Sequence, residues 1–421
     1  MRTVVAAGVA FVAALAALAV LHRSPATPAP AAVAARGAST DARIAQLAAA
    51  PASAETLSGL AGAYLQKARE TADPAFYARA GTAARRALAL SPAHAGALTA
   101  RGTLDLARHH FRAALADAGR ARVLAPEVNK PFGVLADALV ELGRYDDAGR
   151  TLQAMIDRKP NLDAYARVSY FRELHGDLRG AASALRLAIS AGGDVPENAA
   201  YVRSLSGDLE LVRGRPSAAR RAYRTALAEL PRFAPAQYGL ARADAASGRP
   251  RRAIARLRAL VVRLPLPAYV TALGDFELAA GRPAAARRDL ALIGAQERLL
   301  HAAGVNTDVE LALYEADHGS PPRGVLLGRR AWAQAPSVRS ADALGWALTR
   351  AGHPHAGLKW LRHALSLGSR DPSFLYHAGV AAAAAGERAT ARAWLGRLVR
   401  QAPRFSPLYG PRAARLLERL R

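Results

Sequence analysis

A glycine recurs along this chain of 421 residues at a nearly constant spacing, and each copy opens a run rich in Ala, Leu and Arg. The stretch GRPSAARRA at 214 returns as GRPRRAIAR at 248 and as GRPAAARRD at 281. The glycines are Gly143, Gly176, Gly214, Gly248, Gly281, Gly319, Gly352 and Gly386, with gaps of 33, 38, 34, 33, 38, 33 and 34 residues. A period of about 34 residues predicts one long array of stacked repeats.

Each repeat is predicted to be a pair of helices joined at its glycine. Glycine can end the first helix in the left-handed conformation at little cost, and a proline two residues later can begin the second helix, where its missing N–H is harmless. Of all residues, 51% are hydrophobic but only 6% are aromatic, and Ala dominates. Because this composition suits closely packed helices better than a sheet, we expect an all-α fold.

Small side chains stand at two fixed distances from the repeating glycine. Five residues after it are Ala148, Ala181, Ala219, Ala253, Ala286, Gly324, Gly357 and Ala391. Seven residues before it are Ala136, Ser169, Gly207, Ala241, Gly274, Ala312, Gly345 and Gly379. In five repeats a proline stands twelve residues after the small residue that follows the glycine, at Pro160, Pro231, Pro265, Pro336 and Pro403.

This period and these small positions resemble the tetratricopeptide-repeat (TPR) superfamily. The resemblance implies a TPR solenoid over residues 54–406, a right-handed superhelix of about ten helix–turn–helix repeats. The expected repeats are 54–92, 95–126, 129–160, 163–193, 200–231, 234–265, 267–303, 305–336, 338–369 and 372–403. Residues 407–421 resemble the polar capping helix that closes such an array.

The sequence departs from the repeat pattern at a few places. His109 and His110 replace the turn glycine of the second repeat, and the two 38-residue gaps place insertions at 192–198 and 292–308. From the second insertion onward, NTDVELALYEADHG and YHAG are similar to segments of a bacterial TPR group of unassigned function. That similarity implies no activity.

The N-terminus is expected to direct the protein to a membrane. Residues 3–21 are an uncharged apolar run of nineteen residues, nearly long enough to span a bilayer. Residues 1–23 therefore fit either a signal peptide or an uncleaved signal anchor, and both alternatives place the rest of the chain outside the cytoplasm. Residues 24–53 are expected to be a Pro/Ala-rich linker that leads into the array.

No pattern in the sequence predicts catalysis or a cofactor. The repeats occupy the chain, and no phosphate-binding glycine loop, HExxH or GxSxG motif is present. The absence of cysteine excludes Cys-ligated metal sites, and the eleven histidines are not spaced as convergent ligands. We expect a protein that is not an enzyme and that holds no cofactor or metal.

The family resemblance implies that the first helix of each repeat lines a concave groove for a protein or peptide partner, through repeat positions two, five, nine, twelve and thirteen. Carried over, these positions give Asp137, Tyr170, Asp208, Tyr238, Arg242, Asp275, Asp342, Trp346, Arg350 and Tyr376. One interpretation is a row of carboxylates with an aromatic end, suited to a basic or mixed amphipathic segment. The alternative is that the polar positions are simply solvated.

The charge of the chain allows a second function. Its formal net charge is +25, almost all of the cations are Arg, and Arg220, Arg221, Arg224, Arg251 and Arg252 are predicted on outer helices. Such a surface could contact an anionic membrane or an envelope polyanion. Nucleic acid is not favoured, because no aromatic-interleaved basic groove is present. The main expectation is a noncatalytic scaffold for protein binding, located outside the cytoplasm and active in envelope complex assembly, with the polyanion surface as the alternative.

Overall fold

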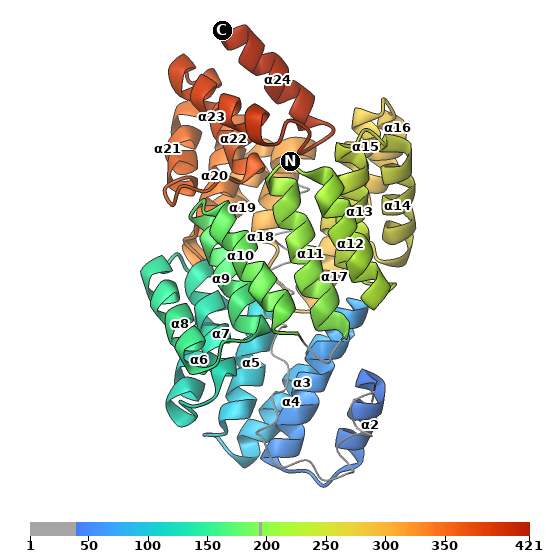
Figure 1. The fold of residues 1–421 in the computed structure, drawn as a ribbon, viewed down its shortest axis with the longest axis vertical. Coiled ribbons are helices and arrows are strands. Elements are labelled where there is room, and N and C mark those ends of the chain that lie inside the picture. The colour runs from blue at the N-terminus through green and yellow to red at the C-terminus, as the bar shows by residue number, and fades with distance from the viewer. Residues whose placement is uncertain (1–38, 193–195) are drawn as a thin grey trace.

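The computed structural model describes residues 39–192 and 196–421, and all regular secondary structure in these ranges is helical (Figure 1). Within these ranges the first helix is α2 (Thr40–Ala49) and the last is α24 (Tyr409–Leu420). Between them lie ten helix pairs: α3 (Ala54–Thr71) and α4 (Ala75–Leu90); α5 (Ala95–Ala107) and α6 (Phe111–Leu124); α7 (Asn129–Glu141) and α8 (Tyr145–Arg158); α9 (Leu162–Leu174) and α10 (Leu178–Ser190); α11 (Pro196–Val212) and α12 (Pro216–Glu229); α13 (Ala234–Ala246) and α14 (Pro250–Arg263); α15 (Pro267–Ala279) and α16 (Pro283–Leu290), followed by α17 (Ile293–Ala302); α18 (Asp308–His318) and α19 (Pro321–Gln334); α20 (Val338–Arg350) and α21 (Pro354–Ala364); α22 (Pro372–Ala384) and α23 (Arg388–Gln401). The expected all-α array of ten repeats is confirmed.

The turns between paired helices have the predicted chemistry. Gly214 has φ = +71°, and Pro216 follows it as the first residue of α12. The same geometry returns at Gly248 and Gly281, with φ of +75° and +72°. In the second repeat His109 takes over this role with φ = +62°, an uncommon conformation for a residue with a side chain.

The small positions let neighbouring helices pack closely around large side chains. Tyr223 on α12 is fully buried, and its ring lies against Gly207 on α11 and Gly239 on α13. A Cβ atom added at either glycine would overlap that ring. One outer-helix side chain thus contacts the inner helices of two successive repeats, which is how stacked repeats build one continuous core.

The two insertions and the expected linker contain helical structure that periodicity did not predict. The insertion at 292–308 forms α17 after a break in the outer helix of the seventh repeat. Within the expected linker, residues 40–49 form α2, which is held to α3 by an ion pair between Lys67 and Asp41 at 2.6 Å. At the other end, α24 covers the last repeat and buries Tyr409, Ala413 and Leu420.

The solenoid coils far enough for its first half to meet its second half, so that α9 to α11 lie beside α18 to α22 (Figure 1). The turns of the second to fifth repeats meet the segments that end the seventh to tenth repeats, five repeats further along the chain. We call this row of contacts the seam. Its pairs are His109 with Asn306, Gly143 with Pro336, Gly176 with Gly368 and Gly214 with Gln401.

At the seam, backbone and side-chain contacts join residues that are almost two hundred positions apart. The backbone N–H of Val338 donates to the hydroxyl of Tyr145 at 2.8 Å, and Gln401 Nε2 donates to the carbonyl of Val212 at 2.8 Å. Arg339 forms an ion pair with Glu141 at 3.3 Å. These contacts close the superhelix and bring the inner helices of its two halves face to face.

The predicted signal or anchor at 1–23, and residues 24–38 of the predicted linker, lie outside the described residues. Among the helices of the described ranges, none combines the length and apolar character that crossing a bilayer requires.

Candidate functional site

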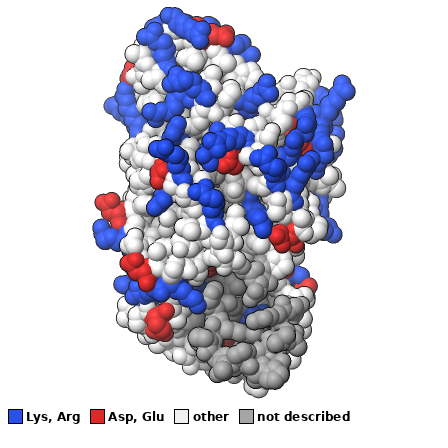
Figure 2. Space-filling model, viewed as in Figure 1, with Lys and Arg blue, Asp and Glu red and all other residues white. Residues whose placement is uncertain are grey.

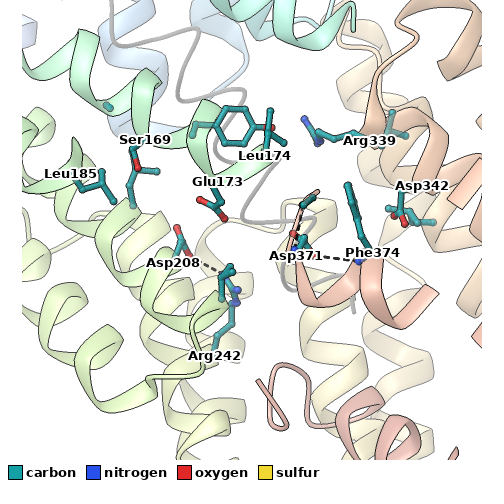
Figure 3. A pocket seen from close by; sticks show the side chains of 17 residues that line it. Ser169, Glu173, Leu174, Leu185, Asp208, Arg242, Arg339, Asp342, Asp371 and Phe374 are labelled. Atoms are coloured by element: carbon teal, nitrogen blue, oxygen red, sulfur yellow. Dashed lines mark hydrogen bonds and ion pairs between the residues drawn. The ribbon is translucent and has the colours of Figure 1, made fainter. Parts of the chain in front are cut away.

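The helices of the two halves line a cavity of ≈ 80 Å³ (Figure 3). One wall comes from α9, α10, α11 and α13, and the opposite wall from α18, α20, α22 and the segment before α22. Apolar side chains form much of the surface, among them Leu185, Leu205 and Phe374. The space is large enough for several water molecules or for a small group of atoms, since one water needs about 10–15 Å³ by this measure.

Charged side chains from both walls project toward this cavity, and carboxylates outnumber cations. The charged residues of the lining are Glu173, Asp208, Arg242, Arg339, Asp342 and Asp371. Arg242 Nη1 donates to Asp208 Oδ1 at 2.8 Å, which pairs those two charges (Figure 3). Arg339 is held by Glu141 at 3.3 Å and by Glu310 at 3.7 Å. Both cations are therefore already committed to carboxylates.

Glu173 faces the cavity near the centre of the view in Figure 3, between the Asp208–Arg242 pair and Asp371. Burial, together with the negative charges of Asp371 and Asp208, raises the pKa of Glu173 to about 8, against the opposing effect of Arg242. Asp371 caps α22 by accepting from the backbone N–H of Ser373 at 2.7 Å. Burial raises the pKa of Asp371 to about 6 despite this bond.

Arginine and histidine side chains of following repeats contact the carboxylates that the sequence assigned to an open groove. Arg167 Nη2 donates to Asp137 Oδ2 at 2.9 Å, and the inner helices of two further repeats are joined in the same way. The other contacts are between His318 and Asp275 and between His377 and Asp342, both at 2.7 Å. Asp137, Asp275 and Asp342 are all at least 90% buried. They therefore link adjacent inner helices, and the prediction of a solvent-open carboxylate row is corrected.

A sequence model of the tetratricopeptide repeat matches residues 211–276, which form the fifth to seventh helix pairs in part. The surrounding pairs repeat the same turn and packing positions. The chain is a TPR protein. A search of curated proteins finds no match to the sequence.

Several solved structures are similar to this TPR array. TTC0263, a thermophilic TPR protein of Thermus thermophilus, is 23% identical over 40% of this chain and 91% of its own, with a TM-score of 0.37. A TPR protein of Parabacteroides merdae is 15% identical over 68% and 98%, with a TM-score of 0.38. The human IFIT1 dimer with m7Gppp-AAAA is 15% identical over 75% and 72%, with a TM-score of 0.49. Values this low carry no information about what the present TPR protein binds.

The predicted aromatic end of the TPR groove is packed inside the array. Trp346 is 2% exposed, stacks on His377 with ring centroids 4.4 Å apart, and donates from Nε1 to Asp317. Tyr376 is 5% exposed and contacts Tyr409 of the capping helix. A partner cannot reach these rings in this conformation, so the expectation of an accessible aromatic end is corrected.

The remaining predicted positions are divided between the cavity and the core of the TPR array. Tyr170, Asp208, Arg242 and Asp342 line the cavity. Tyr238 is 2% exposed and packs against Tyr269, outside the cavity lining. Arg350 is half-exposed, lies over the ring of Trp346 and donates to the carbonyl of Ala316. The structure thus brings four of the ten predicted residues together.

Two charged cavity residues occupy repeat positions that the family pattern includes but that were not carried over. Glu173 is the twelfth residue of α9, one turn beyond Tyr170, and Arg339 is the second residue of α20. Residues three apart on a helix share a face, so the periodicity of α9 was a signal for Glu173. No signal in the sequence identified Asp371, because it reaches the cavity only through the coiling of the array.

Proposed function

We propose that this TPR protein is a noncatalytic scaffold that binds a segment of a protein partner, one side chain of which enters its interior cavity. Stacked helical repeats generally present their inner helices as binding surfaces. The observation that carries the proposal is the convergence of Tyr170, Glu173 and Asp208 from the first half of the array with Asp342 and Asp371 from the second half. A segment bound there would contact both halves of the superhelix at once.

A photocrosslinking experiment tests where a ligand lies. Asp208 and Asp342 also line the cavity, but each is paired with a neighbouring side chain that its replacement would leave without a partner. The probe is therefore placed at Tyr170, where it replaces one aromatic side chain with another. Peptides selected from a displayed random library should crosslink to benzoylphenylalanine at Tyr170. The same probe at Thr225, exposed on the outer helix α12, is the matched control.

Crosslinks at Thr225 alone would contradict binding in the cavity. The same conclusion would follow if selection enriched no peptide over a surface without the protein. Repeating the selection at high salt separates a fitted segment from one that is held only by surface charge.

The proposal includes a location outside the cytoplasm and a role in assembling an envelope complex. Its support is the apolar run at 3–21, which has the length of a signal peptide or signal anchor. A reporter such as alkaline phosphatase, which is active only after export, should gain activity when fused after residue 38. A fusion that stays inactive while its protein accumulates would contradict the location.

The alternative function, contact with an envelope polyanion or anionic membrane, is favoured by one observation. Figure 2 shows Lys and Arg crowded over the part of the face where α12 and α14 lie. Four exposed cations make no ion pair within the described residues, namely Arg221 and Arg224 on α12, Arg251 on α14 and Arg287 on α16. A cationic surface without carboxylate partners attracts anions in a salt-dependent way.

Heparin affinity chromatography tests this alternative. Changing Arg221, Arg224, Arg251 and Arg287 to Gln should lower the salt concentration of elution clearly more than the same change at four other exposed positions. The comparison positions are Arg79, Arg86, Arg120 and Arg122, on α4 and α6. Equal shifts for the two variants would mean that net charge acts without a localised surface.

A further inference from the structure

The cavity contains acceptors that nothing in the described part of the chain satisfies. The side chain of Asp342 is 1% exposed and gives Oδ1 to His377, while its Oδ2 has no hydrogen-bond partner. The carboxylate of Glu173, whose side chain is partly exposed, forms no hydrogen bond or ion pair with any described residue. A buried acceptor without a partner, such as Asp342 Oδ2, is destabilising, and more so when it is charged. The two acceptors come from opposite walls of one cavity.

The surplus charge of the lining is negative. Four carboxylates face two guanidinium groups, and each guanidinium is already paired, Arg242 with Asp208 and Arg339 with Glu141 and Glu310. A cation would satisfy the carboxylate of Glu173 and offset the negative charges of Asp371 and Asp208 beside it (Figure 3). The described residues contain no cluster of three or more His, Asp or Glu that could hold a metal ion, so the complementary ligand is an organic cation.

Two further features select a guanidinium group over an ammonium group. Tyr170 and Phe374 line the same cavity, and a planar guanidinium stacks on aromatic rings and is weakly hydrated. Its five N–H donors point in fixed directions within one plane, which suits acceptors placed on opposite walls. We propose that the cavity binds the guanidinium group of an arginine side chain in a partner peptide. This inference rests on the proposed function, because it names the chemistry of the segment that the scaffold takes up.

Calorimetric titration with methylguanidinium tests this chemistry, and the neutral N-methylurea, which has the same number of heavy atoms, serves as the matched ligand. We expect methylguanidinium to bind in the millimolar range and N-methylurea to bind at least tenfold more weakly. Acetyl-Gly-Arg-Gly-amide should bind more tightly than methylguanidinium, and its citrulline counterpart should not bind. Glu173→Gln should weaken the cationic ligands at least tenfold, whereas Glu127→Gln, at an exposed loop position, should leave them unchanged.

Binding should also strengthen with pH, because the ligand needs Glu173 ionised. Its pKa of about 8 in the free protein predicts affinity about a hundredfold lower at pH 6 than at pH 9. The ionisable groups that face it are Tyr170 on α9, Asp208 on α11, Arg242 on α13, Arg339 and Asp342 on α20, and Asp371 before α22. The pH dependence should be lost in Glu173→Gln.

Each remaining outcome decides the question. Equal binding of methylguanidinium and N-methylurea, or full binding by Glu173→Gln, would overturn the inference. If neither cationic ligand binds but peptides crosslink at Tyr170, the inference fails and the proposed function stands. If methylguanidinium binds and the arginine peptide does not, the site takes a small organic cation, and the assignment to a peptide is wrong.

Discussion

Replacing three seam glycines with alanine is expected to open the superhelix. An added Cβ at each of these glycines would overlap a backbone carbonyl of the other half of the array. The pairs are Gly143 with Pro336, Gly176 with Gly368 and Gly214 with Gln401. Backbone atoms cannot move aside as a flexible side chain can, so the two halves must separate. A compact chain of this length has a radius of gyration of about 22 Å. Small-angle X-ray scattering of the triple variant should show an increase of about 3 Å or more.

The array supplies its own control for this experiment. Gly248, Gly281 and Gly386 have the same left-handed conformation, with φ of +75°, +72° and +80°, but no neighbouring atom lies within 4 Å of an added Cβ. Alanine at each of these positions costs about 1–2 kcal/mol for its conformation. The control triple variant should therefore lose stability while keeping its dimensions. An equal change in the dimensions of both variants would show that the seam does not hold the superhelix closed.

Glu173→Gln is expected to stabilise the protein at alkaline pH. The pKa of Glu173 is about 8 in the folded chain and about 4.3 in an unfolded one. Folding therefore takes up a proton between these values, and stability falls as the pH rises from about 4 to 8. The variant lacks this titration, so it should be more stable at pH 9 by as much as about 5 kcal/mol and nearly unchanged at pH 4.

Urea denaturation at pH 5, 7 and 9 measures this effect. Asp371 and Asp208 keep their raised pKa values in the variant, so part of the decline with pH should persist. Glu127→Gln, which changes an exposed carboxylate in the same way, should follow the parent protein at every pH. Parallel pH profiles for the parent and Glu173→Gln would mean that this carboxyl titrates normally and that the cavity does not bury it.

The individual repeats were predictable because each depends on residues close together in the chain. Gly214 and Pro216 act within one turn, and Tyr223 meets Gly207 and Gly239 in adjacent helices. The candidate site was predictable only in part. Tyr170 and Asp208 reach the cavity because their positions face inward on every first helix of the array. Whether an inward position stays open depends on its neighbours, so the burial of Trp346 and the pairing of Asp275 with His318 were not predictable.

The period, the helical pairs, the turn residues and the packing positions follow from the sequence alone, because local propensity and nearest-neighbour contacts set all of these in a stacked repeat. How far the array coils is visible only in the folded chain. A small rotation added at each repeat brings Gly143 to Pro336 and Gly214 to Gln401 after five repeats. That accumulated rotation closes the superhelix, places Glu173 opposite Asp371, and turns an expected open groove into an interior cavity.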